Sequence, residues 1–402
     1  MNVLVWQWGR LGAGPRFGAC LAEALRGRSG IEVTLSLCRD AEIMAGPNPP
    51  LCEMPVRTYR GMGSFLLRLA TAPLALPFLL VRLRRFTPDL AICAMPGPLD
   101  TLMAIALRLL GARLVVVVHD ADAHPGDGFP LQMQLQRLLC RLAHGLAVLC
   151  APVGARLRHQ RLAGIGRRKL IRFQHPPFGF AMPPPERPDP TPRLLCFGRM
   201  LPYKGLDLLA GALAALPPHQ PVAVRVVGYG PECPALDALR ACPSVTVENR
   251  WVPETEIGAL LAWSDAMILP YREASQSGVA AAALAAGRPV ITTRVGGLGE
   301  QLAAARQLLL CEPDATSLAQ AIRSWLAAPA PVAPPADADA AWRAAASDLL
   351  LAIGTTLPPN PRRIRGNLKT AFGSARFAIP NPALRPLSVI ATNISDATVP
   401  QQ

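Results

Sequence analysis

Two basic side chains follow a short apolar run in the second half of the sequence, and their spacing suits a phosphate. The run Arg193–Phe197 is typical of a buried strand, and Gly198 allows the backbone to leave that strand tightly. Arg199 supplies a planar guanidinium, and Lys204 places an ammonium close to the start of a helical run. A helix N-terminus adds positive partial charge, so the segment suits a diphosphate. An arginine and a lysine in such a loop are equally familiar as solvated surface charges.

The segments after this loop strengthen the phosphate interpretation. In order along the chain they are Val226-Val-Gly-Tyr-Gly-Pro-Glu232, Trp263-Ser-Asp-Ala-Met-Ile-Leu-Pro-Tyr271, Ser275-Gln-Ser-Gly278, Gly287-Arg-Pro-Val-Ile-Thr-Thr-Arg-Val-Gly-Gly-Leu298 and Glu300. Their order and spacing resemble the nucleotide-sugar domain of the family-4 glycosyltransferases, the retaining group 1 enzymes of the GT-B fold. The resemblance covers about Pro192 to Leu326 well and the N-terminal half only loosely.

The resemblance implies a set of donor-binding residues. These are Gly198, Gly228, Trp251, Val252, Glu273, Gln276, Ser277 and Gly278. Trp251 and Val252 fall where relatives contact the base, and Gly228 would let the backbone approach the nucleotide. A plain turn explains Gly228 equally well.

The sequence departs from the family at one point. Two glutamates separated by seven residues normally precede the Gly-x-Pro-Val segment, and Ala274 and Ala282 stand at those positions here. In the family, the first glutamate contacts the donor sugar and the second contacts the ribose.

Three explanations of this departure stay open. Glu273 serves after a shift of one residue, or the loop Ser275–Ser277 takes over together with the amides of Ser277 and Gly278. Those amides begin a helical run, where an anion is favoured. The third explanation is an inactive relative.

The first half of the sequence also predicts a parallel α/β domain. Asp89–Ala94 and Arg113–His119 are continuous apolar runs, as expected of central parallel strands. An early strand is followed by the glycine loop Gly9–Gly14, whose spacing does not fit a dinucleotide site. In the family this loop faces the acceptor, which makes Arg10, Gly12 and Gly14 the acceptor-side candidates. Arg10 is also explained as a surface charge.

His119 ends its strand at the edge of the sheet where ligands bind in open α/β folds. Relatives commonly place a cleft histidine there, so His119 joins Arg199 and Lys204 in the expected catalytic set. Its implied role is to bind the transferred sugar, not to abstract a proton. The following Asp120-Ala-Asp122 admits another hypothesis, a divalent metal held as in GT-A glycosyltransferases. Since GT-B enzymes use basic side chains and a helix end instead, the resemblance implies no metal and no cofactor besides the nucleotide-sugar substrate.

The expected fold class is α/β, of the GT-B type with two facing Rossmann-like, doubly wound parallel-sheet domains. The expected bounds are 1–182 for the N-terminal acceptor-side domain, 183–192 for a proline-rich linker, 193–328 for the C-terminal nucleotide-sugar-binding domain, 329–354 for a linker and a helix that crosses back, and 355–402 for a disordered basic tail.

The composition limits the partners. The formal charge of +14 over 402 residues suits an anionic lipid, an anionic nucleotide or a nucleic acid. Nucleic acid ranks last, because aromatic residues make up 5% and no binding module is recognised. Ten cysteines without a Cys-x-x-Cys pair predict reduced thiols, and Met1–Val5 carries no basic leader. These features predict a cytoplasmic protein.

The segment Gly61–Arg85 is about as long and apolar as a membrane span, but Arg68, Pro73 and Pro77 interrupt it. Two interpretations remain. One is a buried helix of the first domain, and the other is peripheral docking on the inner face of an anionic membrane through the basic end of the segment.

The resulting prediction is an enzyme, a hexosyltransferase-type glycosyltransferase. It would move a sugar from a nucleotide-diphosphate sugar to a glycan or lipid-linked acceptor in bacterial envelope or exopolysaccharide synthesis, with retention and without metal. The main alternative is an inactive GT-B scaffold or partner subunit of a polysaccharide assembly. A nucleotide-sugar epimerase of the same fold would need further acid/base carboxylates, which the sequence does not single out.

Overall fold

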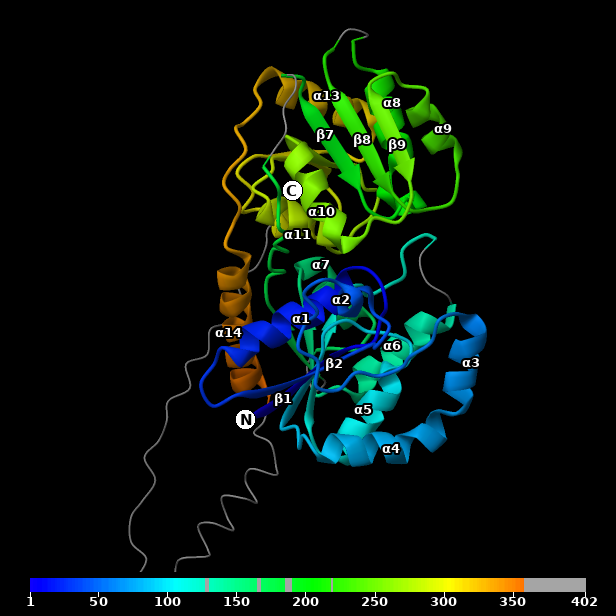
Figure 1. Ribbon diagram of the computed structural model, residues 1–402, viewed down its shortest axis with the longest axis vertical. Coiled ribbons are helices and arrows are strands. Elements are labelled where there is room, and N and C mark those ends of the chain that lie inside the picture. The colour runs from blue at the N-terminus through cyan, green and yellow to red at the C-terminus, as the bar shows by residue number, and fades with distance from the viewer. Residues whose placement is uncertain (127–129, 165–167, 185–189, 218–219, 358–402) are drawn as a thin grey trace, which may run out of the picture. The chain divides into compact units, whose positions relative to one another are not determined.

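Two six-stranded parallel sheets organise the computed structural model of the chain (Figure 1). The structure describes residues 1–126, 130–164, 168–184, 190–217 and 220–357, and these belong to one compact unit, Met1–Asn360. The expected tail therefore lies almost wholly outside the described residues, as does part of the expected linker. The expected domain bounds stay predictions, whereas the two sheets run from 2 to 172 and from 193 to 311.

The first sheet has the strand order β2-β1-β3-β4-β5-β6, and all its pairs are parallel. Its strands are β1 (Asn2–Gln7), β2 (Glu32–Leu37), β3 (Leu90–Cys93), β4 (Arg113–Val118), β5 (Gly145–Val148) and β6 (Lys169–Arg172). The helices of this half are α1 (Ala13–Arg26), α2 (Glu42–Ala45), α3 (Met62–Ala70), α4 (Ala72–Arg84), α5 (Asp100–Leu109), α6 (Pro130–Leu142) and α7 (Ala151–His159).

The second sheet has the order β12-β11-β10-β7-β8-β9 and is also parallel throughout. Its strands are β7 (Arg193–Phe197), β8 (Ala223–Gly228), β9 (Val245–Asn249), β10 (Ala266–Leu269), β11 (Val290–Thr293) and β12 (Leu308–Cys311). Its helices are η1 (Pro202–Lys204), α8 (Leu206–Ala214), α9 (Pro234–Arg240), α10 (Glu254–Trp263), α11 (Gly278–Ala285), α12 (Leu298–Gln301) and α13 (Ala315–Ala327).

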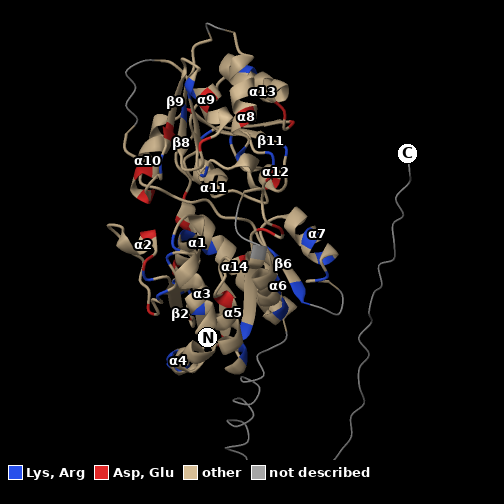
Figure 2. Ribbon diagram, turned by 90° about the vertical axis from the view of Figure 1, so that its right-hand side faces the viewer, with Lys and Arg blue, Asp and Glu red and all other residues tan. Residues whose placement is uncertain are grey.

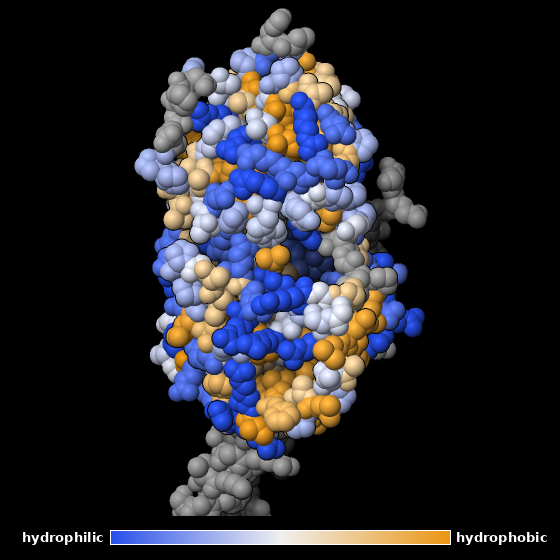
Figure 3. All heavy atoms as spheres, turned by 45° about the vertical axis from the view of Figure 1, so that its right-hand side comes forward, coloured by the Kyte–Doolittle hydropathy of each residue, from blue (hydrophilic) through white to orange (hydrophobic). Residues whose placement is uncertain are grey.

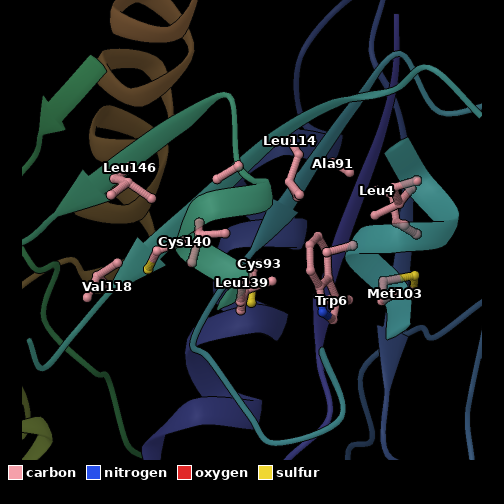
Figure 4. Packing of buried hydrophobic residues seen from close by; sticks show 14 of the residues in the cluster. Leu4, Trp6, Ala91, Cys93, Met103, Leu114, Val118, Leu139, Cys140 and Leu146 are labelled. Atoms are coloured by element: carbon pink, nitrogen blue, oxygen red, sulfur yellow. The ribbon is translucent and has the colours of Figure 1, made fainter. Parts of the chain in front are cut away.

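The strands of both sheets are apolar because helices cover both faces of each sheet. Figure 4 shows one such layer, in which Trp6 of β1, Cys93 of β3 and Leu114 of β4 meet Met103 of α5 and Leu139 of α6. These five side chains are almost fully buried.

The helix α14 (Ala338–Thr356), the last one among the described residues, packs against the first sheet although it follows the second one in sequence (Figure 1). Trp342, Ala346, Leu349 and Ile353 recur at helical spacing and join the core on the α1 side of that sheet. The Trp342 indole donates to Pro177 O at 2.9 Å. The chain therefore ties its C-terminal helix to the half in which it began.

The segment 61–85 was expected to be interrupted at Arg68, Pro73 and Pro77, and it breaks just before Pro73, whereas Pro77 lies inside a helix. It forms two helices, α3 and α4, bent by 74° at Thr71, and α4 is buried on one face only. Pro73 stands in the first turn of α4, where a missing N–H costs nothing, so it begins a new helix instead of kinking a long one. Within the described residues no single helix is long and apolar enough to cross a membrane, although this bent pair passes by length and composition.

Candidate active site

A cavity of about 590 Å³ lies between the two sheets and is lined by loops from both (Figure 3 shows the hollow on one face). In the second sheet the chain order reverses between β7 and β10, and segments that follow both strands line the cavity. Open α/β sheets bind ligands at such a switch point, outside the carboxyl ends of the strands. The fold thus places a ligand site where the sequence motifs lie.

The loop after β7 brings the two predicted cations to the cavity wall. Gly198, Arg199 and Lys204 all line it, and Gly198 has φ 120°, a conformation that L side chains rarely adopt. Arg199 Nη2 donates to Tyr203 Oη at 2.9 Å, and Lys204 Nζ lies 3.8 Å from the centroid of the Tyr271 ring. The aromatic rings hold the cations in place, so the loop presents an ordered basic surface.

Gly228 is required by the packing of the two strand ends. A Cβ at this position would lie 1.7 Å from Gly198 O, a distance that no side chain tolerates. Gly228 lines the cavity, but this contact explains the glycine without any nucleotide.

The start of α11 is built around Ser277, which lines the cavity with Gln276 and Gly278. Ser277 Oγ caps the helix by accepting from the amides of Val279 at 3.2 Å and Ala280 at 3.4 Å. The Ser277 amide donates to Gln301 Oε1 at 2.8 Å, so the expectation that this amide faces an anion is wrong.

Two polar groups at the same helix end, the Gly278 amide and Gln276 Oε1, are available to bind a ligand. The Gly278 amide stands in the first turn of α11, where a helix offers it no acceptor. The buried Gln276 Oε1 lacks a hydrogen-bond partner among the described residues. A ligand hydroxyl would satisfy this oxygen, and an anion would satisfy the amide.

The positions of the missing glutamates do face the cavity. Ala274 and Ala282 both line it, whereas Glu273 is not among its lining residues. Glu273 instead reaches His124, whose Nδ1 lies 3.4 Å from its Oε2. Ala274 and Ala282 thus occupy the wall where the family pattern led us to expect carboxylates, and the nearby polar groups come from Gln276 and Ser277.

The predicted catalytic histidine lies in the opposite wall, after β4. His119 is 4% exposed, lines the cavity, and donates from Nε2 to Ala94 O at 2.9 Å. Burial lowers the pKa of His119, so the ring is neutral and its Nδ1 is an acceptor. A neutral ring suits the binding of a sugar hydroxyl.

Two of the three acceptor-side candidates line the same wall. Gly12 and Gly14 border the cavity near His119, together with Gln7, whereas Arg10 does not. The Arg10 carbonyl accepts the Glu42 amide at 2.9 Å, so this residue holds the loop that carries Glu42.

A cluster around His124 was missed from the sequence. His124 Nε2 lies 3.1 Å from Asp120 Oδ1, and its ring stacks on Tyr203 at 4.7 Å between centroids. The hydrogen bond to Asp120 raises the pKa of His124, and Glu273 adds to the effect. Burial alone would raise the pKa of Asp120, but the bonds and positive charge of its neighbours outweigh burial and lower it. His124 follows the predicted site residue His119 by five positions, and this closeness in sequence was the one available signal for it. Only the fold places His124 beside Tyr203 of the second half.

The two aspartates of the Asp-x-Asp pattern have different partners. Asp122 pairs with Arg156 and accepts from Gln160 Nε2 at 2.8 Å, while Asp120 faces His124. Among the residues that the structure describes, no group of three or more His, Cys, Asp or Glu side chains could hold a metal ion.

Acidic side chains also link the halves at the other end of the cavity. Glu42 Oε1 accepts from the Trp251 indole at 3.3 Å and from the Glu254 amide at 3.1 Å, and Glu254 pairs with Arg16. Figure 2 shows α2 and α10, which carry these acids, at the border between the halves. Trp251 and Val252 line the cavity as expected, and no sequence signal pointed to Glu42.

Comparisons with known proteins agree with this architecture. Residues 191–328 match the family model "Glycosyl transferases group 1", and residues 12–172 match "Glycosyl transferase 4-like domain". Glycogen synthase of Mycobacterium tuberculosis is 35% identical over 153 residues, which are 36% of this chain and 36% of that protein. D-inositol 3-phosphate glycosyltransferase of Jonesia denitrificans is 38% identical over 128 residues, 29% of this chain and 30% of that protein. The aligned region thus spans only about a third of these relatives.

Solved structures match over a longer stretch. Sucrose-phosphate synthase of Thermosynechococcus elongatus has a TM-score of 0.60 at 16% identity and covers 93% of this chain and 100% of its own. HepE of Anabaena, in complex with UDP and glucose, has a TM-score of 0.58 at 17% identity with the same coverage. A UDP-GlcNAc 2-epimerase of Neisseria meningitidis scores 0.54 at 11% identity and covers 87% of this chain and 100% of its own. At these identities the likeness concerns the fold, and the expected α/β class of the GT-B type is confirmed.

Proposed function

We propose that this chain, which belongs to the glycosyl transferases of group 1, transfers a sugar from a nucleotide-diphosphate sugar to a glycan or lipid-linked acceptor. One observation carries the proposal. Arg199, Lys204 and the start of α11 share one cavity with the buried, neutral His119 of the opposite sheet. This arrangement offers a diphosphate pocket on one side and a hydroxyl-binding ring on the other.

The donor would lie along the second sheet. Its diphosphate would face Arg199, Lys204 and the Gly278 amide, and its base would lie towards Trp251 and Val252. As the bond to the anomeric carbon breaks, negative charge grows on the leaving diphosphate. Prearranged cations and a helix amide stabilise that charge, which lowers the barrier without a metal.

The transferred sugar would lie between the walls. His119 Nδ1 can accept a hydrogen bond from one of its hydroxyls, and Gln276 Oε1 can accept a hydrogen bond from another. The acceptor would enter on the side of Gly12 and Gly14, where the wall has small side chains. Because the group 1 resemblance extends to the loops of the second sheet, we propose retention of the anomeric configuration and a hexose as the transferred sugar.

UDP is the donor nucleotide that we favour, because HepE was solved with UDP and UDP-glucose on the same fold. A role in bacterial envelope or exopolysaccharide synthesis and a cytoplasmic location stay predictions from the sequence.

The test is to incubate the purified protein with UDP-, GDP- and ADP-sugars and to measure nucleotide release, with and without EDTA. Release from one donor that persists in EDTA supports a metal-independent transferase, and proton NMR of the product then gives the anomeric configuration. Release that EDTA abolishes would contradict the metal-free mechanism.

A second candidate is an inactive scaffold, which the methyl groups of Ala274 and Ala282 in the cavity wall favour. It predicts thermal stabilisation by the nucleotide without release from any donor, even when lipid and glycan acceptors are added. An epimerase has less support: Glu42, Asp120, Asp122 and Glu254 line the cavity, and each already has a partner.

A further inference from the structure

The helix α4 is apolar on both sides, although it lies at the surface. Its inner face carries Leu76, Leu79, Leu80 and Leu83, which pack against the core of the first sheet. A surface helix of a soluble domain normally has a polar outer face, because that face meets water. The outer face of α4 does not follow this rule.

Large apolar side chains form a stripe along that outer face. Leu74, Phe78 and Val81 follow one another at i, i+4 and i+7, so they point the same way. They are 72%, 78% and 56% exposed. Pro73 and Pro77 lie on the same face and are exposed as well. The stripe ends at Arg84 and Arg85.

The preceding helix extends the apolar surface. Met62, Leu66 and Leu67 of α3 are 57%, 54% and 64% exposed, while Phe65 anchors the helix to the protein. We call the exposed faces of α3 and α4 together the α3–α4 face. These helices belong to the lower half of the molecule in Figure 1. On the face drawn in Figure 3, the surface of that half carries hydrophobic side chains among hydrophilic ones.

The segment that carries this face has charges of one sign only. Between Glu53 and Asp89 the sequence contains no acidic residue, and the arginines there are Arg57, Arg60, Arg68, Arg82, Arg84 and Arg85. One of them, Arg60, pairs with Asp40 at 3.3 Å. Figure 2 shows basic and no acidic colour on α4. The partner that fits exposed apolar side chains flanked by arginines is an interface with an apolar interior and a negative surface.

We infer that the α3–α4 face docks this chain on an anionic lipid bilayer. Leu74, Phe78 and Val81 would enter the acyl boundary, and Arg84 and Arg85 would lie at the level of the phosphate groups. The 74° bend between the helices suits a shallow, two-armed contact in the plane of the interface. Since this face belongs to the half that carries Gly12 and Gly14, docking would hold the acceptor side at the membrane.

Docking is independent of glycosyl transfer, so it is tested without a donor. The full chain is mixed with sucrose-loaded vesicles of phosphatidylglycerol and phosphatidylethanolamine, or of phosphatidylcholine alone, and the sedimented fraction is measured. We expect binding to the anionic vesicles only, and a severalfold decrease from 0.1 to 1 M salt, because the Debye length shrinks from about 10 to about 3 Å.

Two variants separate the apolar and the basic contributions. The pair Leu74→Gln and Phe78→Gln should reduce binding about tenfold or more, since two large side chains no longer enter the lipid. The matched control is Leu109→Gln with Leu351→Gln, two leucines that are 63% and 69% exposed on α5 and α14. This control should bind as the unmodified chain does.

The pair Arg84→Gln and Arg85→Gln should bind several times more weakly, with a shallower salt dependence. Here Arg141→Gln with Arg158→Gln, two exposed arginines of α6 and α7, is the control. Melting temperatures confirm that every variant is folded. Equal binding to both vesicle types, or binding unaffected by Leu74→Gln with Phe78→Gln, would overturn the inference. A chain that ignores vesicles but self-associates through this face, as seen by light scattering, would overturn it as well.

Discussion

His124 and Glu273 connect the two halves of the chain, with the ring Nδ1 3.4 Å from the carboxylate Oε2. His124 follows β4 of the first sheet, and Glu273 follows β10 of the second. With Asp120 on the other ring nitrogen, the imidazole lies between two carboxylates, a position that favours its charged form. The contact is therefore a titratable link between the halves.

The first prediction concerns the pH dependence of this link. Asp120 foremost, and then Glu273, raise the pKa of His124. A histidine whose pKa is higher in the folded state stabilises the fold below its free pKa of about 6.5, and this stability is lost as pH rises through the folded pKa. His124→Gln should thus cost on the order of 0.5 to 1 kcal/mol near pH 6 and much less near pH 9.

Thermal unfolding of the two proteins across that pH range measures the effect. His159→Gln, a change of an exposed histidine on α7, is the control. A cost for His124→Gln that stays constant with pH would show that the ring acts by packing on Tyr203 and not by its charge.

The second prediction concerns the leaving-group cations. Arg199→Ala and Lys204→Ala should each lower turnover by about 10² to 10³, because each removes one donor aimed at the departing diphosphate. Melting temperatures should change little, since both side chains lie at the cavity wall. Arg323→Ala on α13 removes an arginine elsewhere and should leave turnover intact. Near-normal turnover in both Arg199→Ala and Lys204→Ala would contradict the proposed reaction.

The third prediction concerns Gln301, which holds the loop before α11. Its Oε1 accepts from the Ser277 amide at 2.8 Å, and its Nε2 donates to Ser277 O at 2.9 Å. Gln301→Ala leaves the buried Ser277 amide without a partner, whereas Ser277 O keeps the amide of Ala281 at 3.0 Å. The loss should cost about 1 to 3 kcal/mol of stability. Because the same loop carries Gln276 and Gly278, donor KM should rise more than kcat falls.

Steady-state kinetics and urea unfolding check both effects. Gln320→Ala on α13 offers a glutamine-to-alanine change at an exposed position and should alter neither quantity. If Gln301→Ala lost stability but kept its donor KM, the side chain would serve the fold and not the positioning of the donor loop.

The fourth prediction concerns Asp100, a fully buried carboxyl at the start of α5 that accepts from the Gly97 amide at 2.7 Å. Burial raises the pKa of Asp100 to about 7. Between its ordinary pKa near 3.8 and the folded value, the unfolded chain has released this proton and the folded chain keeps it. Stability therefore falls as pH rises through that window.

Asp100→Asn keeps the shape and the acceptor for Gly97 but removes the titration. Its free energy of unfolding should fall less steeply between pH 4.5 and 7.5, by a difference on the order of 2 to 4 kcal/mol. Chemical denaturation at several pH values measures this difference, with the exposed Asp339→Asn as control. Parallel pH profiles for Asp100→Asn and the unmodified chain would contradict the assignment.

Local patterns in the sequence determined the elements and the donor loop. The apolar runs around β3, β4 and β7 are strands in a parallel sheet because both faces of such strands are buried, which leaves a continuous hydrophobic signature. Gly198, Arg199 and Lys204 could also be predicted from the sequence, because a tight turn, two cations and a helix start are adjacent in the chain. The rule that strand ends meet at one edge applies within one sheet, so the common cavity with His119 of the other sheet was expected only from the resemblance to the GT-B family.

Contacts between distant residues depended on the tertiary structure. The link from Glu42 to Trp251 joins residues 209 positions apart, and the link from His124 to Glu273 joins residues 149 apart. No local periodicity encodes such pairs, because they depend on how two separately folded sheets meet. The Ser277 amide is an example of a group whose partner could not be predicted from the sequence, because that partner, Gln301, lies on another helix.

The same reason explains the segment 61–85. Its composition permitted both a buried helix and a membrane-docking one, because an apolar residue looks the same in sequence whether protein or lipid covers it. Packing against the first sheet uses Leu76, Leu79 and Leu83 and leaves Leu74 and Phe78 outside. The sequence by itself determined that this segment is apolar and basic, and only the tertiary structure decided which side chains face the solvent, since that depends on the shape of the surface beneath the helix.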